Sequence, residues 1–191
     1  MQQPYNSFED KDKTMLYART QFIKLNQKSL LIAFALVFCA NTTLALANWP
    51  DVRGPTADGR SDATGLSLKW SETENIVWKT PIHNLGYSTP VVWGDQIWLT
   101  TATKKGETLY AVCIDLNSVR VIHDIEVFHP KKPQRIHRLN SYATPSAVIE
   151  EGSAYAHYGT HGTACIKTKT GRVQWHRDDL NCEHMQGPVS S

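Results

Sequence analysis

The chain has 191 residues, of which 41% are hydrophobic, and it carries 20 Lys and Arg against 18 Asp and Glu. Five of the basic and three of the acidic residues lie in the first 47 positions, so 15 of each remain in the rest of the chain. The absence of net charge there argues against a broad face that binds nucleic acid or an anionic membrane.

Residues 1–47 are typical of a secretory signal peptide. A long polar and basic lead precedes the apolar run Leu30–Ala40, and Ala45–Ala47 supplies an Ala-x-Ala site before Asn48. A charged lead, an apolar core of about 7–15 residues and small residues before the cut are the parts of such a signal. Met15 is an alternative start that leaves a signal of more ordinary length. We expect export to the periplasm or the extracellular space.

An uncleaved signal that anchors the chain in the membrane is the alternative interpretation of residues 1–47. The apolar run Leu30–Ala40 is shorter than the roughly 20 residues that span a bilayer, and polar residues follow it. We therefore expect cleavage, and no membrane span in the chain that remains.

Residues 48–74 predict an irregular N-terminal lead, because they are rich in Gly, Pro, Asp and Ser. Asp51, Asp58 and Asp62 raise the question of a calcium loop. Their spacing matches no calcium-loop signature and lacks the closing Glu. We interpret them as turn-forming residues. The run Asn75–Thr80 follows, with β-branched and aromatic residues before a proline, and predicts an orphan strand ahead of the first repeat.

The rest of the chain is organised around two matching segments, Tyr87–Glu126 and Tyr142–Arg177. Tyr-Ser-Thr-Pro in the first corresponds to Tyr-Ala-Thr-Pro in the second at an offset of 55 positions, and a Cys-Ile and an Arg-Val pair recur at an offset of 52. Repetition at about 50 residues, with short extended runs inside, indicates a propeller or a solenoid. We predict an all-β fold, a partial β-propeller of about two four-stranded antiparallel blades.

Each blade is expected to contain four strands joined by short turns. The expected strands are Tyr87–Val92, Gln96–Thr101, Leu109–Ile114 and Arg120–Val127 in blade 87–127, and Thr144–Ile149, Ser153–Tyr158, Thr163–Lys167 and Arg172–Arg177 in blade 142–177. Residues 188–191 resemble the start of a third blade. Because a closed propeller has about four to eight blades, residues 75–191 are expected to be an incomplete propeller, from a truncated gene or a longer protein. Its open blade edges are expected to self-associate.

The cysteines after the signal are Cys113, Cys165 and Cys182. Export permits disulfides, but an odd count leaves at least one thiol unpaired. Cys113 and Cys165 hold equivalent places in the two repeats, where equivalent strands point their side chains alike. We expect these two to be buried as small apolar residues.

The stretch Cys165–Trp175 resembles the repeat of pyrroloquinoline-quinone (PQQ) propellers, which runs Ala-Leu-Asp, two residues, Thr-Gly, three residues, Trp. The first unit keeps the Asp as Asp115 but has Val119 for the Gly and His123 for the Trp. The opening Trp49–Pro55 also looks like the start of exported PQQ-like propellers of environmental bacteria. The resemblance covers Trp49–Ser191 and implies the fold rather than a reaction.

The resemblance implies two functional classes. Quinoprotein dehydrogenases bind PQQ and calcium in a central funnel, and many carry adjacent cysteines; outer-membrane assembly propellers bind no cofactor and act as docking surfaces. This sequence has no Cys-Cys pair, and no residue matches the aspartate base or the calcium ligands of the dehydrogenases. We expect a non-catalytic exported scaffold or binding surface for proteins or extracellular polymers such as polysaccharides. The alternative is the N-terminal piece of a PQQ-dependent dehydrogenase, in which case PQQ and calcium are the cofactors.

No catalytic, cofactor-binding or metal-ligating residue is assigned from the sequence. His157 and His161 fall across a strand end and a turn, so their rings need not converge on a metal. Cys182 and His184 are sequence neighbours, which rarely align as nucleophile and base. The basic segment 128–140 is interpreted as a solvated loop between blades. The aromatic residues Trp98, Tyr142, Tyr155, Tyr158 and Trp175 are interpreted as packing rather than as a sugar-binding groove.

Overall fold

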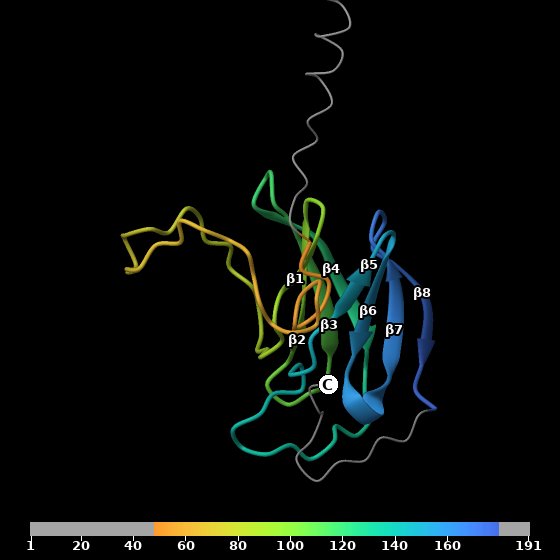
Figure 1. The fold of residues 1–191 in the computed structure, drawn as a ribbon. Coiled ribbons are helices and arrows are strands. Elements are labelled where there is room, and N and C mark those ends of the chain that lie inside the picture. Colours follow the sequence, from red (N-terminus) through yellow and green to blue (C-terminus); the bar gives the residue numbers. More distant parts are fainter. Residues whose placement is uncertain (1–47, 180–191) are drawn as a thin grey trace, which may run out of the picture. The chain divides into compact units, whose positions relative to one another are not determined.

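The structure of the chain, a computed structural model, describes residues 48–179. These residues form an all-β fold of two four-stranded antiparallel sheets, in the orders β1-β2-β3-β4 and β5-β6-β7-β8 (Figure 1). The predicted signal peptide 1–47, the pair Cys182 and His184, and the predicted start of a third blade at 188–191 lie outside the described residues.

Six of the strands begin at the residue that the sequence pattern predicts. The first sheet contains β1 (Val91–Trp93), β2 (Gln96–Ala102), β3 (Leu109–Asp115) and β4 (Arg120–Phe128). The second contains β5 (Val148–Glu150), β6 (Ser153–His157), β7 (Thr163–Lys167) and β8 (Arg172–Arg177), with the 3-10 turn η1 (Gly159–His161) between β6 and β7. The prediction of an all-β fold with two four-stranded sheets is confirmed.

The inner strands β1 and β5 are shorter than predicted, because their first residues bond across the two units instead of along their own sheet. Tyr87 and Ser88 donate their backbone N–H groups to the carbonyl of Ala143, at 3.0 and 3.2 Å. Thr89 donates its N–H to Ser146 Oγ at 2.8 Å. The prolines at positions 90 and 145 add no N–H to a ladder. Ladder pairing therefore starts only at β1 and β5 themselves.

The predicted orphan strand Asn75–Thr80 is wrong. This segment is extended, but no strand of residues 48–179 lies beside it, and unpaired backbone does not make a strand. It belongs to an arm, residues 60–80, that runs away from the sheets (Figure 1). The arm returns to the sheet at Thr80, whose Oγ1 donates to the carbonyl of Val119 at 2.7 Å.

The two sheets repeat one local geometry. The pairing of β3 with β4 shifts register between Cys113 and Ile114, and the pairing of β7 with β8 shifts between Cys165 and Ile166. The turn after each third strand also matches, because Val119 has φ 58° where Gly171 has φ 68°. The sequence repeat is thus also a structural repeat, in which the β-bulge between the third and fourth strands has the same position in both sheets.

The core lies between the two sheets. One face of β1–β4 packs against one face of β5–β8, and the buried residues of this seam form one cluster. Its members are Val91, Trp98, Ala102, Leu109, Ala111, Cys113, Ala143, Ala147, Ile149, Ala154, Ala156, Tyr158 and Ile166. Cys113 and Cys165 are free thiols that are 0% and 2% exposed, so their predicted role as small buried residues is confirmed.

The start of the lead forms backbone hydrogen bonds with both β1 and β5. Trp49 exchanges both backbone hydrogen bonds with Val92, each at 2.8 Å, and the next carbonyl, of Pro50, accepts from the N–H of Ile149 at 2.8 Å. The ring of Trp49 lies against Gly54, where an added Cβ would stand 2.8 Å from ring atoms. The lead is irregular as predicted, but its first residues bridge β1 and β5.

The substitution Val119→Gly is expected to stabilise the protein by about 0.5–1 kcal/mol. A β-branched residue in the left-handed region costs about 1–2 kcal/mol, and the extra freedom of glycine in the unfolded chain offsets part of that gain. Urea denaturation measures the difference. The matched change Gly171→Val should destabilise, because its Cβ would also lie 2.7 Å from His123 Nδ1. Equal effects of the two changes would refute the equivalence of the turns.

The substitution Tyr158→Phe is expected to cost about 1–2 kcal/mol of unfolding free energy. Tyr158 is 0% exposed, and its hydroxyl donates across the seam to the carbonyl of Tyr110 at 2.6 Å. Removing the donor leaves a carbonyl in the core short of a partner. The control is Tyr155→Phe, whose hydroxyl donates to Glu150 Oε1 at the surface. That change should cost less than about 0.5 kcal/mol in the same thermal melts.

Candidate functional site

The outward face of the second sheet carries a row of four side chains that are paired across all four strands. Val148 pairs with Tyr155, Tyr155 with Cys165, and Cys165 with Trp175. The two ends of this row are exposed, Val148 by 47% and Trp175 by 44%, and the rings of Tyr155 and Trp175 lie 6.1 Å apart. We call this surface the open face.

The first sheet carries the same row, and there it is buried. Val91 pairs with Trp98, Trp98 with Cys113, and Cys113 with His123. Val91, Trp98 and Cys113 are 0%, 1% and 0% exposed. A valine, an aromatic residue and a cysteine thus recur in the same strand positions, followed by an aromatic or imidazole ring. In the first sheet this row forms one side of the contact between the two sheets.

The surface that covers the buried row is the opposite face of the second sheet. Its row is Ile149, Ala154, Ile166 and Val173, which are again paired from β5 to β8. All four belong to the core cluster or pack against it. Two alanines on β6, Ala154 and Ala156, leave room for the large rings opposite. The contact therefore joins unlike faces of like sheets, which is a heterologous arrangement.

A polar network crosses the same seam. The carbonyl of Thr168 accepts from Gln96 Nε2 at 3.2 Å and from His123 Nε2 at 3.0 Å. Because a carbonyl only accepts, His123 carries its proton on Nε2. Gln96 Oε1 in turn accepts from Trp98 Nε1 at 3.0 Å. His123 stands where the second unit has Trp175, and its imidazole donates to the carbonyl of Thr168 in the turn of the next sheet.

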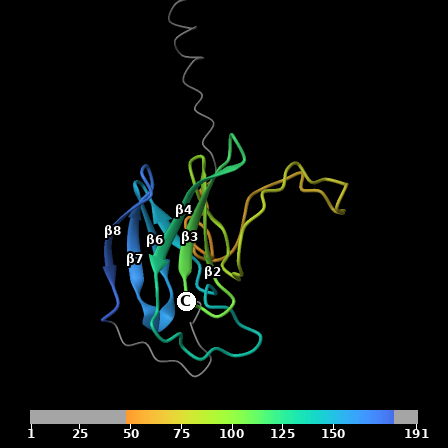
Figure 2. The same cartoon turned by 180° about the vertical axis from the view of Figure 1, so that it is seen from behind.

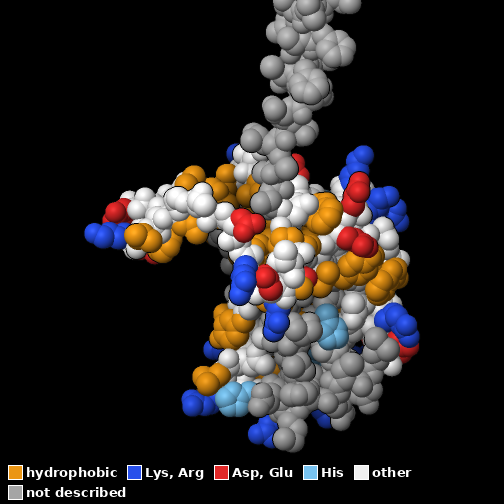
Figure 3. All heavy atoms as spheres, viewed as in Figure 1, with side chains coloured by type: hydrophobic (Ala, Val, Ile, Leu, Met, Phe, Trp, Pro, Cys, Tyr) orange, Lys and Arg blue, Asp and Glu red, His pale blue; other side chains and the backbone are white. Residues whose placement is uncertain are grey.

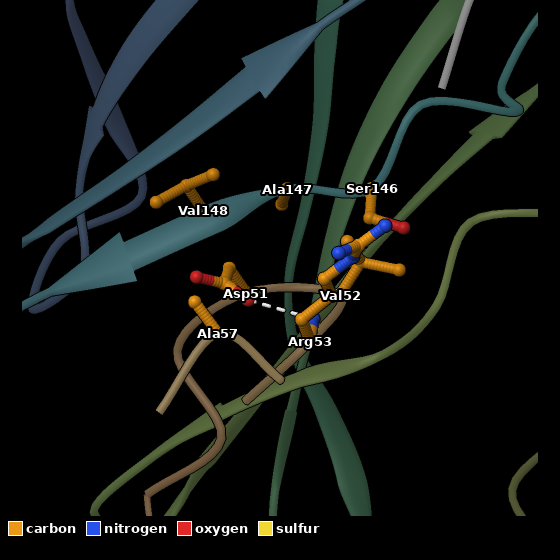
Figure 4. A pocket seen from close by; sticks show the side chains of 7 residues that line it. All are labelled: Asp51, Val52, Arg53, Ala57, Ser146, Ala147 and Val148. Carbon is orange, nitrogen blue, oxygen red and sulfur yellow. Dashed lines mark hydrogen bonds between the residues drawn. The ribbon is translucent and has the colours of Figure 1, made fainter. Parts of the chain in front are cut away.

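An open pocket of about 270 Å³ adjoins the open face (Figure 4). Its walls come from the lead and from the start of the second sheet: Asp51, Val52, Arg53, Ala57, Ser146, Ala147 and Val148. Val148 belongs both to the pocket and to the open face. The pocket is slightly smaller than the roughly 300–1,000 Å³ of typical small-molecule sites, so we treat it as one end of the open face.

Two of the three aspartates of the lead, Asp51 and Asp58, act as turn residues, as predicted. Asp51 Oδ1 accepts from the N–H of Arg53 at 2.7 Å, and Asp58 Oδ1 accepts from the N–H of Arg60 at 3.0 Å. The hydroxyl of Thr56 also donates to Asp58, at 2.6 Å, and this bond lowers the pKa of the Asp58 carboxyl. Both carboxylates are thus engaged with the neighbouring backbone, in the manner of Asx turns.

His157 and His161 are engaged separately. His157 Nδ1 shares a hydrogen bond of 2.8 Å with Thr163 Oγ1, whereas His161 Nε2 accepts from the N–H of Gln134 at 3.2 Å. Burial lowers the pKa of both imidazoles. Between residues 48 and 179, no three His, Cys, Asp or Glu side chains are gathered as a metal site would need.

The five aromatic residues that could have lined a sugar-binding groove do not share one surface. Trp98 and Tyr158 are buried at 1% and 0% exposure, in accord with the interpretation of packing. Tyr142 lies beside Gly106, where an added Cβ would stand 2.6 Å from its ring. Only Tyr155 and Trp175 lie together on an accessible face. Burial raises the pKa of Tyr158, and it raises that of Cys113 to about 12, so neither group is a reactive acid or thiolate.

The basic segment 128–140 is a loop between the sheets, as predicted. It has no strand or helix after Phe128, and the side chains of Lys131, Lys132, Arg135 and Arg138 are exposed. The rings of Phe128 and Tyr158 meet edge to face at 5.8 Å. The other end is held by Gln134, whose Oε1 accepts from Thr160 Oγ1 at 2.6 Å.

The open face was not found from the sequence, although a signal for it was present. Val148 and Tyr155 each lie 57 positions after their counterparts in the first unit, and Cys165 and Trp175 each lie 52 positions after theirs. The offset of 52 contained the second pair, but the offset of 55 read from the sequence sets Val91 against Ser146 instead of Val148, so the register between strands was needed to find the row.

Comparison of the chain with known protein families gives no match, and comparison with curated protein sequences gives none either. Of the residues that the structure describes, none form a helix with the length and apolar character to cross a bilayer.

Stability is expected to fall as the pH is lowered through the ordinary range of histidine, about pH 6.5. Burial lowers the pKa of His161 and His157 in the folded state, so the unfolded chain binds more protons and low pH favours it. Protonation also removes the acceptor that His161 offers to Gln134. Urea denaturation at about pH 7.5 and about pH 5 measures the change.

The variant His161→Gln is the control for this pH dependence. Its amide oxygen is an acceptor that does not titrate, so the loss of stability on acidification should be smaller than in the parent chain. His157→Gln should remove a further part. An unchanged loss in both variants would show that other groups set the pH dependence.

Proposed function

We propose that this chain is a non-catalytic exported repeat scaffold of the PQQ-propeller type, and that the open face is its binding surface. Under this proposal the two sheets are blades of one kind. The partner is a protein that presents a flat apolar sheet face.

The observation that carries the proposal is the repeated row of side chains. In one unit Val91, Trp98 and Cys113 are covered by a sheet, and in the other unit the equivalent Val148, Tyr155 and Cys165 have no sheet over them among residues 48–179. Heterologous contacts between like units continue until a ring closes or a different partner covers the last face. The contact between the two sheets thus indicates the kind of surface that would bind the open face.

The same comparison favours a protein over a polysaccharide as partner. The buried row meets aliphatic side chains of a neighbouring sheet, Ile149, Ile166 and Val173 among them, and its single polar link is to a backbone carbonyl, that of Thr168. A sugar polymer offers hydroxyl groups instead, which need many polar partners. The open face provides few in its middle, where Cys165 is buried beneath the rings of Tyr155 and Trp175.

The test is a longer chain in which a second copy of residues 129–177 is joined after Asp179. If the open face binds a sheet like its own, the added copy should cover it. The free energy of unfolding should rise by at least about 2 kcal/mol, the contribution of burying one large apolar side chain. The fluorescence of Trp175, isolated by comparison with Trp175→Phe, should shift to shorter wavelength.

The matched control carries Ala154→Glu and Ile166→Glu in the added copy alone, which places charges on the face that should make the contact. This control should show neither effect. A longer chain whose Trp175 emission and unfolding midpoint equal those of the original would overturn the proposal.

The dehydrogenase alternative is tested separately by incubating the full chain with PQQ and calcium and following the reduction of an electron-accepting dye. The scaffold proposal expects no cofactor-dependent turnover. Any such turnover, above that of PQQ and calcium alone, would favour the alternative instead.

A further inference from the structure

Most of the exposed large hydrophobic side chains of the described residues lie on the arm and the segment that follows it. Eight of the fourteen exposed large hydrophobic side chains fall between positions 66 and 87. They are Leu66, Leu68, Trp70, Ile76, Val77, Trp78, Leu85 and Tyr87, with Leu68 and Val77 each 94% exposed. Figure 3 shows apolar side chains along the arm. A concentration of exposed apolar side chains of this kind is typical of a contact with another molecule or segment.

The last part of the arm and the residues just after it have no backbone pairing. In the part of the chain that the structure describes, no backbone N–H or C=O of residues 76–82 takes part in a backbone hydrogen bond. Val77 is 94% exposed, between Ile76 at 44% and Trp78 at 41%, an alternation typical of a strand. Exposed strand-like backbone with alternating apolar side chains is the form in which a peptide adds to the edge of a sheet.

The second sheet has an edge that fits such a strand. β8 pairs with β7 on one side, and no strand of residues 48–179 pairs with its other side. Four of its six residues in a row, Gln174–Arg177, are exposed, and Trp175 presents its indole there. An added strand beside β8 would place apolar side chains next to Trp175 on one face and next to Val173 on the other.

The charges of the two elements are complementary. The arm carries Glu72 and Glu74 just before the strand-like segment, and β8 begins and ends with Arg172 and Arg177. Arg177 is ion-paired with Asp179 and Glu72 with Lys79 in the same chain. Arg172 and Glu74 have no ion pair among the described residues, and they meet when the added strand runs parallel to β8. Such pairs contribute to selection of the partner more than to affinity.

The arm does not reach β8 of its own chain. Figures 1 and 2 both show the arm on the side of β1–β4 that faces away from β5–β8. Thr80 is bound to Val119 in the turn before β4, and His83 Nε2 is bound to Asp124 Oδ1 of β4 at 2.8 Å. The base of the arm is thus fixed to the first sheet.

We propose that the segment 75–80 of one copy of this chain adds as a strand to the free edge of β8 in a second copy. The contact is heterologous, because the arm and the edge are different surfaces. Each copy then offers one arm and one edge, so association proceeds head to tail beyond the dimer. The inference is independent of whether the two sheets belong to a propeller.

The first experiment compares two substitutions at one position by analytical ultracentrifugation of the full chain. Val77→Pro removes the backbone N–H and the strand geometry, whereas Val77→Ala only shortens the side chain. We expect Val77→Pro to weaken association about a hundredfold or more and Val77→Ala by about tenfold at most. Both should keep the parent's thermal melt, since Val77 is 94% exposed. Leu139→Lys, in the loop between the sheets, should leave association unchanged.

The second experiment mixes a copy without a working arm, Val77→Pro, with a copy without a working edge, Trp175→Lys. Each variant alone should sediment as a monomer. The mixture should form dimers and nothing larger, because the Val77→Pro copy supplies the only intact edge and the Trp175→Lys copy supplies the only intact arm. Disulfide trapping of Val77→Cys with Trp175→Cys in such a mixture should link the two copies.

Several results would overturn the inference. A parent chain that stays monomeric at all concentrations would do so, as would association of Val77→Pro at the parent's strength. Loss of association with Val77→Pro but not with Trp175→Lys would indicate that arms pair with arms. None of these results bears on the longer-chain test of the open face, so the two proposals fail separately.

Discussion

The structure depends on one contact, in which the aliphatic face of β5–β8 covers the row of Val91, Trp98 and Cys113. This contact removes a tryptophan and several aliphatic side chains from water, and each such side chain contributes about 1.5–3 kcal/mol. The carbonyl of Thr168 sets its register by accepting from Gln96 and His123. The lead, the short inner strands and Tyr158 all add hydrogen bonds across the same seam.

The contact joins unlike faces of the two sheets. The face of the second sheet that is equivalent to the buried face of the first therefore stays uncovered among the described residues. That surface includes Val148, Tyr155 and Trp175, and the pocket beside the lead continues it. The arm extends from the other side of the molecule with exposed apolar side chains, and residues 76–82 have no backbone–backbone hydrogen bonds among the described residues. The first feature belongs to the repeated pair of sheets, whereas the second belongs to a segment that precedes both sheets.

Strand positions were predicted well where the signal is local. Alternation of apolar residues and tight turns placed β2, β3, β4, β6, β7 and β8 at their observed first residues. The prediction failed where the partner lies elsewhere in the fold. The backbone N–H groups of residues 87–89 bond to the second unit instead of to β2. Asn75–Thr80 has strand-forming residues but no strand beside it in the described chain. Propensity describes a residue, whereas a strand requires a pair.

By itself, the sequence determined the repeat, the all-β class, the burial of Cys113 and Cys165 and the glycine of the Thr170-Gly171 turn, because these depend on short-range periodicity and backbone sterics. Only the tertiary structure decided which face of each sheet is covered and which is open. Both faces carry apolar side chains, and the choice between them depends on complementary shapes brought together from distant parts of the chain.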